Sequence, residues 1–234
     1  MLLDLEGRSR ADRIGLGPLT ADLDGAGSAA AEKSLSAIGR AIRPDVEALL
    51  GHSDAKVRTL ALSVLARIAA SAAAAADVEP AIIKGLGDRV PMVRAAAAHA
   101  AGVAAAGATS SRGVAAALVT LLRSKLWRDR AVAAESLGAL GASAAENDLI
   151  EAVGDDSEFV REQAARALGT LRSTAAVSAL LEISTDEIVA VRRASATALR
   201  AIGGDRARAR LREMASDDPD ATVRAAAAGP AAKK

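Results

Sequence analysis

The stretch Asp155-Asp-Ser-Glu-Phe-Val-Arg-Glu-Gln-Ala-Ala-Arg-Ala-Leu-Gly169 contains the pattern on which most of the chain is built. Acidic and serine residues open it, and such side chains suit the positively polarised start of a helix. Apolar residues then recur at intervals of four, four and three, which places them on one helix face: Val160, Ala164, Leu168 and Leu171. The stretch therefore predicts a polar turn followed by a helix that buries one stripe.

The motif recurs along the chain. A Val-Arg pair stands at 57–58, 93–94, 160–161, 191–192 and 223–224, Arg130 fills the one gap, and the arginines are separated by 36, 36, 31, 31 and 32 residues. An Asp precedes four of these arginines by six residues, whereas His52 and Ser124 occupy this position in the other two copies. A constant period of roughly 20 to 50 residues is typical of solenoids and repeat arrays.

Each copy is predicted to contain two helices. The second begins near Val-Arg and ends near a glycine, and the last one, Ala221–Ala228, is stopped by Gly229-Pro230. The expected first helices are 44–50, 79–86, 113–123, 146–153, 175–183 and 205–214. A degraded copy is expected at 29–40, and the long spacings reflect inserts at 70–77 and 104–112. We expect three parts: an irregular N-terminal cap or docking arm (1–25), the repeat array (26–228) and a tail (229–234).

The composition favours closely packed helices with small side chains between them. The chain is 51% hydrophobic, but alanine supplies 62 of its 234 residues and aromatic residues only 1%. Alanine is the best helix former, and its small side chain lets helices approach closely.

The chain contains no cysteine, which excludes disulfides, thiolate nucleophiles and cysteine metal sites. The net charge of +1 argues against nucleic acid, and the acidic N-terminus and weakly apolar stretches predict a cytoplasmic chain without membrane insertion.

The skeleton Asp, Val-Arg, Ala-Ala, Leu-Gly resembles the HEAT repeat, in particular the short form called the phycobilisome-lyase-type HEAT-like repeat. The resemblance covers about residues 26 to 228. It implies an all-α fold, a right-handed α-solenoid of about six to seven two-helix repeats, with the second helices on the concave side. It also implies a binding role for that side.

The repeated arginines and aspartates are interpreted as structural. In such arrays the turn Asp lies beside the Arg of its own or the next repeat, so that successive pairs tie the turns together and cap the helix starts. This expected ladder comprises Arg58, Asp88, Arg94, Arg130, Asp155, Arg161, Asp186, Arg192, Asp218 and Arg224.

Partner-binding residues are sought where the skeleton varies. The positions five and one residues after each arginine form two columns that would line the concave groove. The first column contains Ser63, His99, Glu135, Arg166 and Thr197, and the second contains Thr59, Ala95, Ala131, Glu162 and Arg193. The simpler alternative is that solvent-facing helix positions are polar anyway, with Glu162 and Arg166 as a helical pair.

Trp127 is the only tryptophan and stands between Lys125 and Arg128. It is either a binding anchor or a filler of the space that valine takes in other copies, and the second interpretation is slightly favoured. Phe159 is interpreted as a packing residue.

No catalytic constellation is found. His52 and His99 lie in different copies and neither is followed by Glu, so no metal site is expected, and no phosphate loop or cofactor motif is present. We therefore expect a non-enzymatic scaffold or accessory subunit that binds protein through the groove. The alternatives are a bilin lyase subunit, which needs a larger apolar pocket, and a HEAT-like DNA repair protein, which needs a basic, aromatic-lined groove.

The last helix, Ala221–Ala228, is expected to be either a weak cap of the array or covered by another chain within a larger assembly, and the second interpretation is preferred.

Overall fold

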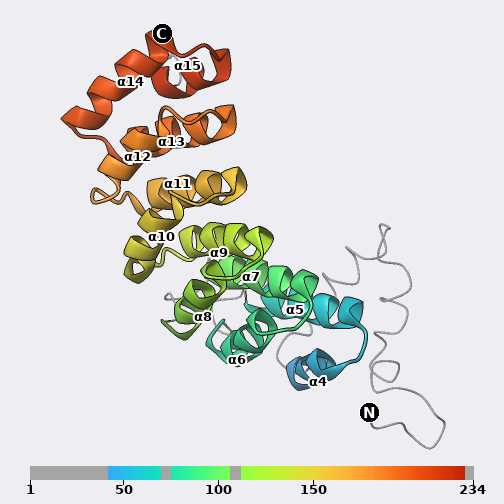
Figure 1. Cartoon of the computed structure of the whole chain (residues 1–234). Coiled ribbons are helices and arrows are strands. Elements are labelled where there is room, and N and C mark those ends of the chain that lie inside the picture. The colour runs from blue at the N-terminus through green and yellow to red at the C-terminus, as the bar shows by residue number, and fades with distance from the viewer. Residues whose placement is uncertain (1–41, 70–74, 106–111, 230–234) are drawn as a thin grey trace, which may run out of the picture. The chain divides into compact units, whose positions relative to one another are not determined.

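The computed structural model describes residues 42–69, 75–105 and 112–229, except for the side chains of 75–77 and 105. Over these residues the chain forms α-helices and short 3-10 helices, with no strand (Figure 1). The all-α expectation is thereby confirmed. The expected N-terminal arm, the degraded copy at 29–40 and residues 230–234 lie outside the described residues.

The described helices follow one another as six pairs. In the N-terminal part these are α4 (Arg43–Ala48), continued by the 3-10 helix η2 (Leu49–Gly51), with α5 (Ala55–Ala69), and α6 (Ala75–Leu86) with α7 (Pro91–Ala105). Next come α8 (Arg112–Leu122) with α9 (Trp127–Ala139), and the 3-10 helix η3 (Ser143–Ala145) and α10 (Glu146–Ala152) with α11 (Glu158–Leu171). The last are α12 (Val177–Ile183) with α13 (Val189–Ile202), and α14 (Asp205–Asp217) with α15 (Ala221–Ala228).

The chain divides into two compact units, residues 1–117 and 118–234, with the boundary inside α8. In the first unit α5 packs on α7, and α6 contacts both. In the second unit the second helices form a continuous row in which α9 packs on α11, α11 on α13, and α13 on α15. The first helices of these pairs, α10, α12 and α14, lie along one side of this row (Figure 1).

Glycines allow the second helices of the second unit to approach each other closely. A Cβ atom added to Gly138 would lie 2.7 Å from Cα of Ala167, and one added to Gly169 would lie 2.8 Å from Cα of Ala198. Real side chains do not tolerate such contacts. The Leu-Gly end of the motif is therefore a packing requirement, with glycine in one helix facing alanine in the next.

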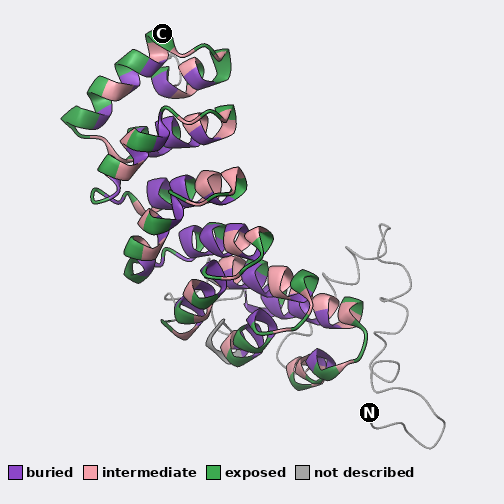
Figure 2. Ribbon diagram, viewed as in Figure 1, coloured by how far each residue is buried: buried purple, intermediate pink, exposed green. Residues whose placement is uncertain are grey.

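The core is made of the residues that the motif places on one face. The positions seven residues after the first five arginines are at most 1% exposed: Leu65, Ala101, Leu137, Leu168 and Leu199. Figure 2 shows the buried residues along the inner faces of the helices. Leu171 differs from the expectation because it is only half-buried. It is the last residue of α11, and Arg172 after it takes the left-handed conformation (φ 52°).

Candidate functional site

Four of the six ladder arginines each join two repeats. Nη1 of Arg161 donates to the carbonyl oxygens of Asp155 (2.9 Å) and Asp156 (3.2 Å) in its own turn, whereas Nε and Nη2 donate to the carboxylate of Asp186 in the next repeat (2.8 and 3.1 Å). Three further pairs make the same bidentate contact between guanidinium and carboxylate, namely Arg58 with Asp88, Arg130 with Asp155, and Arg192 with Asp218. The partner of each of these four arginines is thus the aspartate of the following repeat, whereas Arg94 donates Nη1 to the carbonyl of Asp88 in its own turn at 2.8 Å.

The side chain six residues before the arginine also accepts a backbone N–H two residues further along the same turn. Asp155 accepts the backbone N–H of Ser157 at 2.9 Å. Where aspartate is missing, His52 Nδ1 accepts from the N–H of Asp54 (3.0 Å) and Ser124 Oγ accepts from the N–H of Leu126 (3.2 Å). The two exceptions in the sequence therefore keep the local turn contact, although they have no carboxylate to offer to an arginine.

The ladder shifts the pKa of its carboxylates. For Asp88, the hydrogen bond from Arg58 outweighs burial and lowers the pKa below its ordinary value. For Asp155, burial raises the pKa, but the hydrogen bonds from Arg130 and the backbone of Ser157, together with nearby positive charge, more than reverse this effect. Each carboxylate is held in its charged form.

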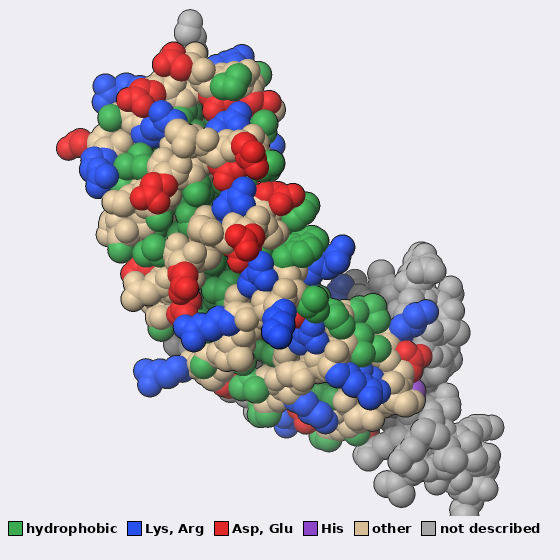
Figure 3. All heavy atoms as spheres, viewed as in Figure 1, with side chains coloured by type: hydrophobic (Ala, Val, Ile, Leu, Met, Phe, Trp, Pro, Cys, Tyr) green, Lys and Arg blue, Asp and Glu red, His purple; other side chains and the backbone are tan. Residues whose placement is uncertain are grey.

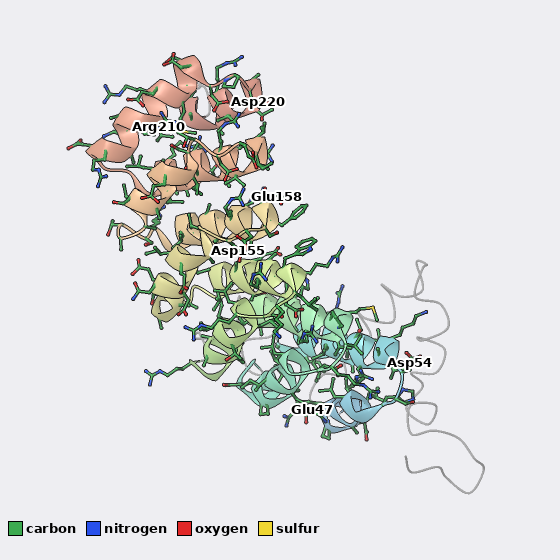
Figure 4. All side chains as sticks on the ribbon, in the orientation of Figure 1. Glu47, Asp54, Asp155, Glu158, Arg210 and Asp220 are labelled. Carbon is green, nitrogen blue, oxygen red and sulfur yellow. The ribbon has the colours of Figure 1, made fainter. Side chains whose placement is uncertain are left out.

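The ladder residues are poorly accessible to a partner. The side chains of Arg192 and Asp218 are 12% and 6% exposed. Within the described part of the chain, Arg224 makes only the contacts with its own turn, donating Nη1 to the carbonyls of Asp218 and Pro219. No repeat follows it among the described residues. We therefore assign these residues to the connection between repeats. Figure 4 labels Asp155 and Asp220 on the turns before α11 and α15.

The two variable columns are only partly exposed. His99, Glu135, Arg166 and Thr197 are exposed, whereas Thr59, Ser63, Glu162 and Arg193 are half-buried and Ala131 is buried. Thr59 and Ser63 donate their hydroxyl groups to backbone carbonyls of their own helix. His99 belongs to the first unit and Glu135 to the second. The columns are thus not a uniform surface.

One part of the columns in the second unit forms a hollow of about 530 Å³. Arg166 reaches it from α11, Arg193 and Thr197 from α13, and small residues of α13 and α15 complete the lining. Arg200, which no column contains, lines it as well. On the face shown in Figure 3, positive and negative side chains are mixed, with hydrophobic atoms between them.

The three arginines of this hollow are held in different ways. Arg166 donates Nη2 to Glu162 on the same helix. Arg200 donates Nη1 to the carbonyl of Ala226 near the end of α15. The guanidinium of Arg193 has no hydrogen-bond or ion-pair partner among the described residues and is only half-buried. The hollow therefore contains one guanidinium, that of Arg193, for which the described part of the chain offers no partner.

The only tryptophan and the only phenylalanine of the chain contact each other. The rings of Trp127 and Phe159 stack with centroids 4.7 Å apart and planes inclined by 19°, and the guanidinium of Arg128 lies 4.6 Å from the centre of the Trp127 ring. Phe159 packs on Trp127 and leaves 48% of its own surface exposed. Trp127 is half-buried, and the valine position of this copy is occupied by the buried Asp129.

A second hollow, of about 490 Å³, lies among the ladder residues Asp186, Arg192 and Asp218. Asp186 and Asp218 already accept hydrogen bonds from ladder arginines. Within the ranges that the structure describes, no group of three or more His, Cys, Asp or Glu is placed to hold a metal ion. None of the described helices has the length and apolar character needed to cross a membrane.

Stacked helix pairs, an inter-repeat ladder and a variable second-helix face define an α-solenoid repeat protein. The family model for HEAT repeats matches residues 42–138, 115–189 and 146–229. The chain therefore belongs to the HEAT-repeat family.

Solved structures show the same fold. An archaeal HEAT-like repeats protein from Thermococcus onnurineus NA1 is 13% identical, with a TM-score of 0.63, over 94% of this chain and 95% of that one. A chain in the complex of CpcE and CpcF of phycocyanin lyase from Nostoc sp. PCC7120 is 24% identical (TM-score 0.54; 65% and 97% covered). A designed armadillo repeat protein in complex with the peptide (KR)4 is 19% identical (TM-score 0.51; 80% and 99% covered). No curated protein matches.

Two features were missed from the sequence. Arg200 stands eight residues after Arg192, where Gly138 and Gly169 stand in earlier copies, and this departure from the skeleton was a usable signal. The contact between Trp127 and Phe159 had no such signal, because it depends on how neighbouring repeats stack.

Proposed function

We propose that this protein is a non-catalytic scaffold or accessory subunit that binds a partner protein through the second-helix face of its C-terminal unit. The supporting observation is the hollow lined by Arg166, Arg193 and Thr197, in which three variable-column residues from two helices meet. Binding sites are concave, with a few polar groups set in an apolar lining, and this hollow falls within the usual range of about 300 to 1,000 Å³.

The stacking of the repeats supports a preformed surface. The row of second helices is held by the glycine contacts and by the partly buried ladder, so the column residues are presented on a rigid support. A preformed surface loses less conformational entropy on binding than a flexible one. The armadillo neighbour, which is in complex with a peptide, shows that a stacked-helix fold of this kind can present such a surface.

The test is affinity capture from a native lysate with three versions of the protein. The groove variant carries Arg166→Glu and Arg193→Glu, and the matched control carries Arg212→Glu on the exposed side of α14, away from the hollow. We expect one stoichiometric protein to be retained by the original chain and by the control, and to be lost with the groove variant. Retention of every bound protein by the folded groove variant would contradict the proposal.

A second candidate is a bilin lyase subunit, which is favoured by the likeness to the phycocyanin lyase complex of CpcE and CpcF. A bilin needs a wide apolar or aromatic surface, whereas this chain has one Trp, one Phe and no Tyr. A visible chromophore that copurifies with the protein, or that binds it from added bilin, would decide for this candidate.

A further inference from the structure

We infer that the hollow formed by Arg166, Arg193 and Arg200 binds an acidic segment of the partner protein, with a carboxylate side chain seated against Arg193. This inference rests on the proposed function and specifies the chemistry of that site.

The charges in the hollow are unbalanced. Its lining contains three arginines and no acidic residue, and Glu162, which pairs with Arg166, offsets only one of them. Arg200 is partly engaged with the carbonyl of Ala226, whereas Arg193 has no partner among the described residues. An arginine presents its donors in a planar fork that matches a carboxylate, so the unpartnered group at Arg193 selects for this ligand.

The surroundings strengthen this interaction. Arg193 is half-buried on α13, and small or short side chains of Ala194, Thr197 and Ala225 lie around it. Because an ion pair in a partly enclosed hollow is less screened than one on an open surface, a ligand carboxylate gains more there than beside an exposed arginine. The alanines leave room for the methylene groups of Glu or Asp.

A peptide fits these features better than a nucleic acid. The described lining contains no aromatic side chain on which a base could stack. The whole chain has a net charge of only +1, which gives little long-range attraction for a phosphate backbone. Clusters of arginines are a recurring means of recognising acidic peptide motifs.

The experiment is a titration of the ¹⁵N-labelled full chain, followed by NMR through the Nε–Hε signals of its arginines. The probes are the peptides acetyl-(Glu)6-amide and acetyl-(Gln)6-amide, and the single-stranded oligonucleotide (dT)10. We expect (Glu)6 to shift the signals of Arg166, Arg193 and Arg200, and to bind at least tenfold more tightly than (Gln)6. Raising the salt concentration should weaken this binding.

Arg193→Gln is the decisive variant because it removes no interaction within the described structure. It should keep the circular dichroism spectrum and weaken (Glu)6 binding at least fivefold, whereas Arg212→Gln on α14 should leave the affinity unchanged. Equal binding of (Glu)6 and (Gln)6, unchanged affinity in Arg193→Gln, or tighter binding of (dT)10 at the same arginines would overturn the inference. If the groove variant with Arg166→Glu and Arg193→Glu abolishes partner capture but (Glu)6 does not bind, the proposed function stands and only the acidic ligand is wrong.

Discussion

The guanidinium of Arg161 binds Asp186, an aspartate 25 residues further along the chain and one repeat away, through Nε and Nη2 at 2.8 and 3.1 Å. Its remaining nitrogen, Nη1, is held by the carbonyls of its own turn. One side chain therefore fixes a turn and joins it to the next. The consequences for stability can be tested separately from those for binding.

Replacing Arg161 by alanine should lower stability without removing the binding face. The variant leaves the partly buried carboxylate of Asp186 without its arginine, and we expect a loss of about 2 kcal/mol, as for other unsatisfied buried polar groups. For a chain of this size, that corresponds to a fall of about 4 to 8 °C in the thermal midpoint. Thermal unfolding followed by circular dichroism measures it.

Arg224→Ala is the matched control for Arg161→Ala. Arg224 makes the same backbone contacts but no inter-repeat ion pair among the described residues, so its removal should cost clearly less stability. Folded Arg161→Ala should still bind the partner. Loss of partner binding at unchanged stability would contradict the structural role of the ladder.

The ladder predicts a loss of stability in acid. The pKa values of Asp88, Asp155, Asp186 and Asp218 are all lowered in the folded chain. The folded state therefore binds protons less readily than the unfolded state, so the stabilisation is complete above the unfolded Asp value of about 3.9 and disappears as the pH falls through the folded values. Thermal midpoints between pH 2 and 6 should fall steeply below about pH 4.

Asp186→Asn tests the origin of this pH dependence. The amide cannot titrate, so the variant should be less stable than the original chain at pH 6, and its midpoint should fall less between pH 5 and 2. An equally steep curve in the variant would mean that groups other than the ladder carboxylate control acid unfolding.

A methyl group at Gly169 should separate two repeats. The new Cβ would lie 2.8 Å from Cα and 2.9 Å from Cβ of Ala198, so α11 and α13 have to move apart. We expect Gly169→Ala to destabilise the chain by about 1 to 3 kcal/mol, the usual cost of overpacking. Gly154→Ala is the control, because its Cβ would meet only the carbonyl oxygen of Glu151 at 3.6 Å. Equal stability of the two variants in urea would refute the packing role of Gly169.

The stacked aromatic pair should couple two repeats. Because Trp127 is the only tryptophan, the intrinsic tryptophan fluorescence comes from the residue that makes this contact. Phe159→Ala should uncover the indole and move its emission to longer wavelength, whereas Val189→Ala on α13 should not. A double-mutant cycle of Trp127→Ala and Phe159→Ala should give a coupling of about 0.5 to 1.5 kcal/mol. Strictly additive effects would show that the rings are merely neighbours.

Helix positions were predictable to within a few residues. The last helix was expected at Ala221–Ala228 and lies there, and α12 begins two residues after the expected start at Ala175. The deviations are larger at the inserts, where α6 begins at Ala75 instead of Glu79. Alanine-rich segments can continue a helix at almost no cost, so a motif does not mark where they end.

The candidate site was less predictable. The column pattern predicts Arg166, Arg193 and Thr197 as partner-binding residues, and these three line one hollow. Arg200 was missed, and its contact with Ala226 depends on the packing of α13 against α15. Residues of one helix face follow from periodicity, but a hollow is formed by several helices together.

The sequence by itself determined the two-helix repeat, its period and the positions of its arginines, aspartates and glycines. It could do so because helical periodicity and turn capping are local, acting over about three to six residues. Only the tertiary structure decided that four of the arginines bind the aspartate of the following repeat, that Trp127 meets Phe159, and that Arg193 is left without a partner among the described residues. These relationships join residues of different repeats, and they depend on how closely neighbouring helices stack and at which register.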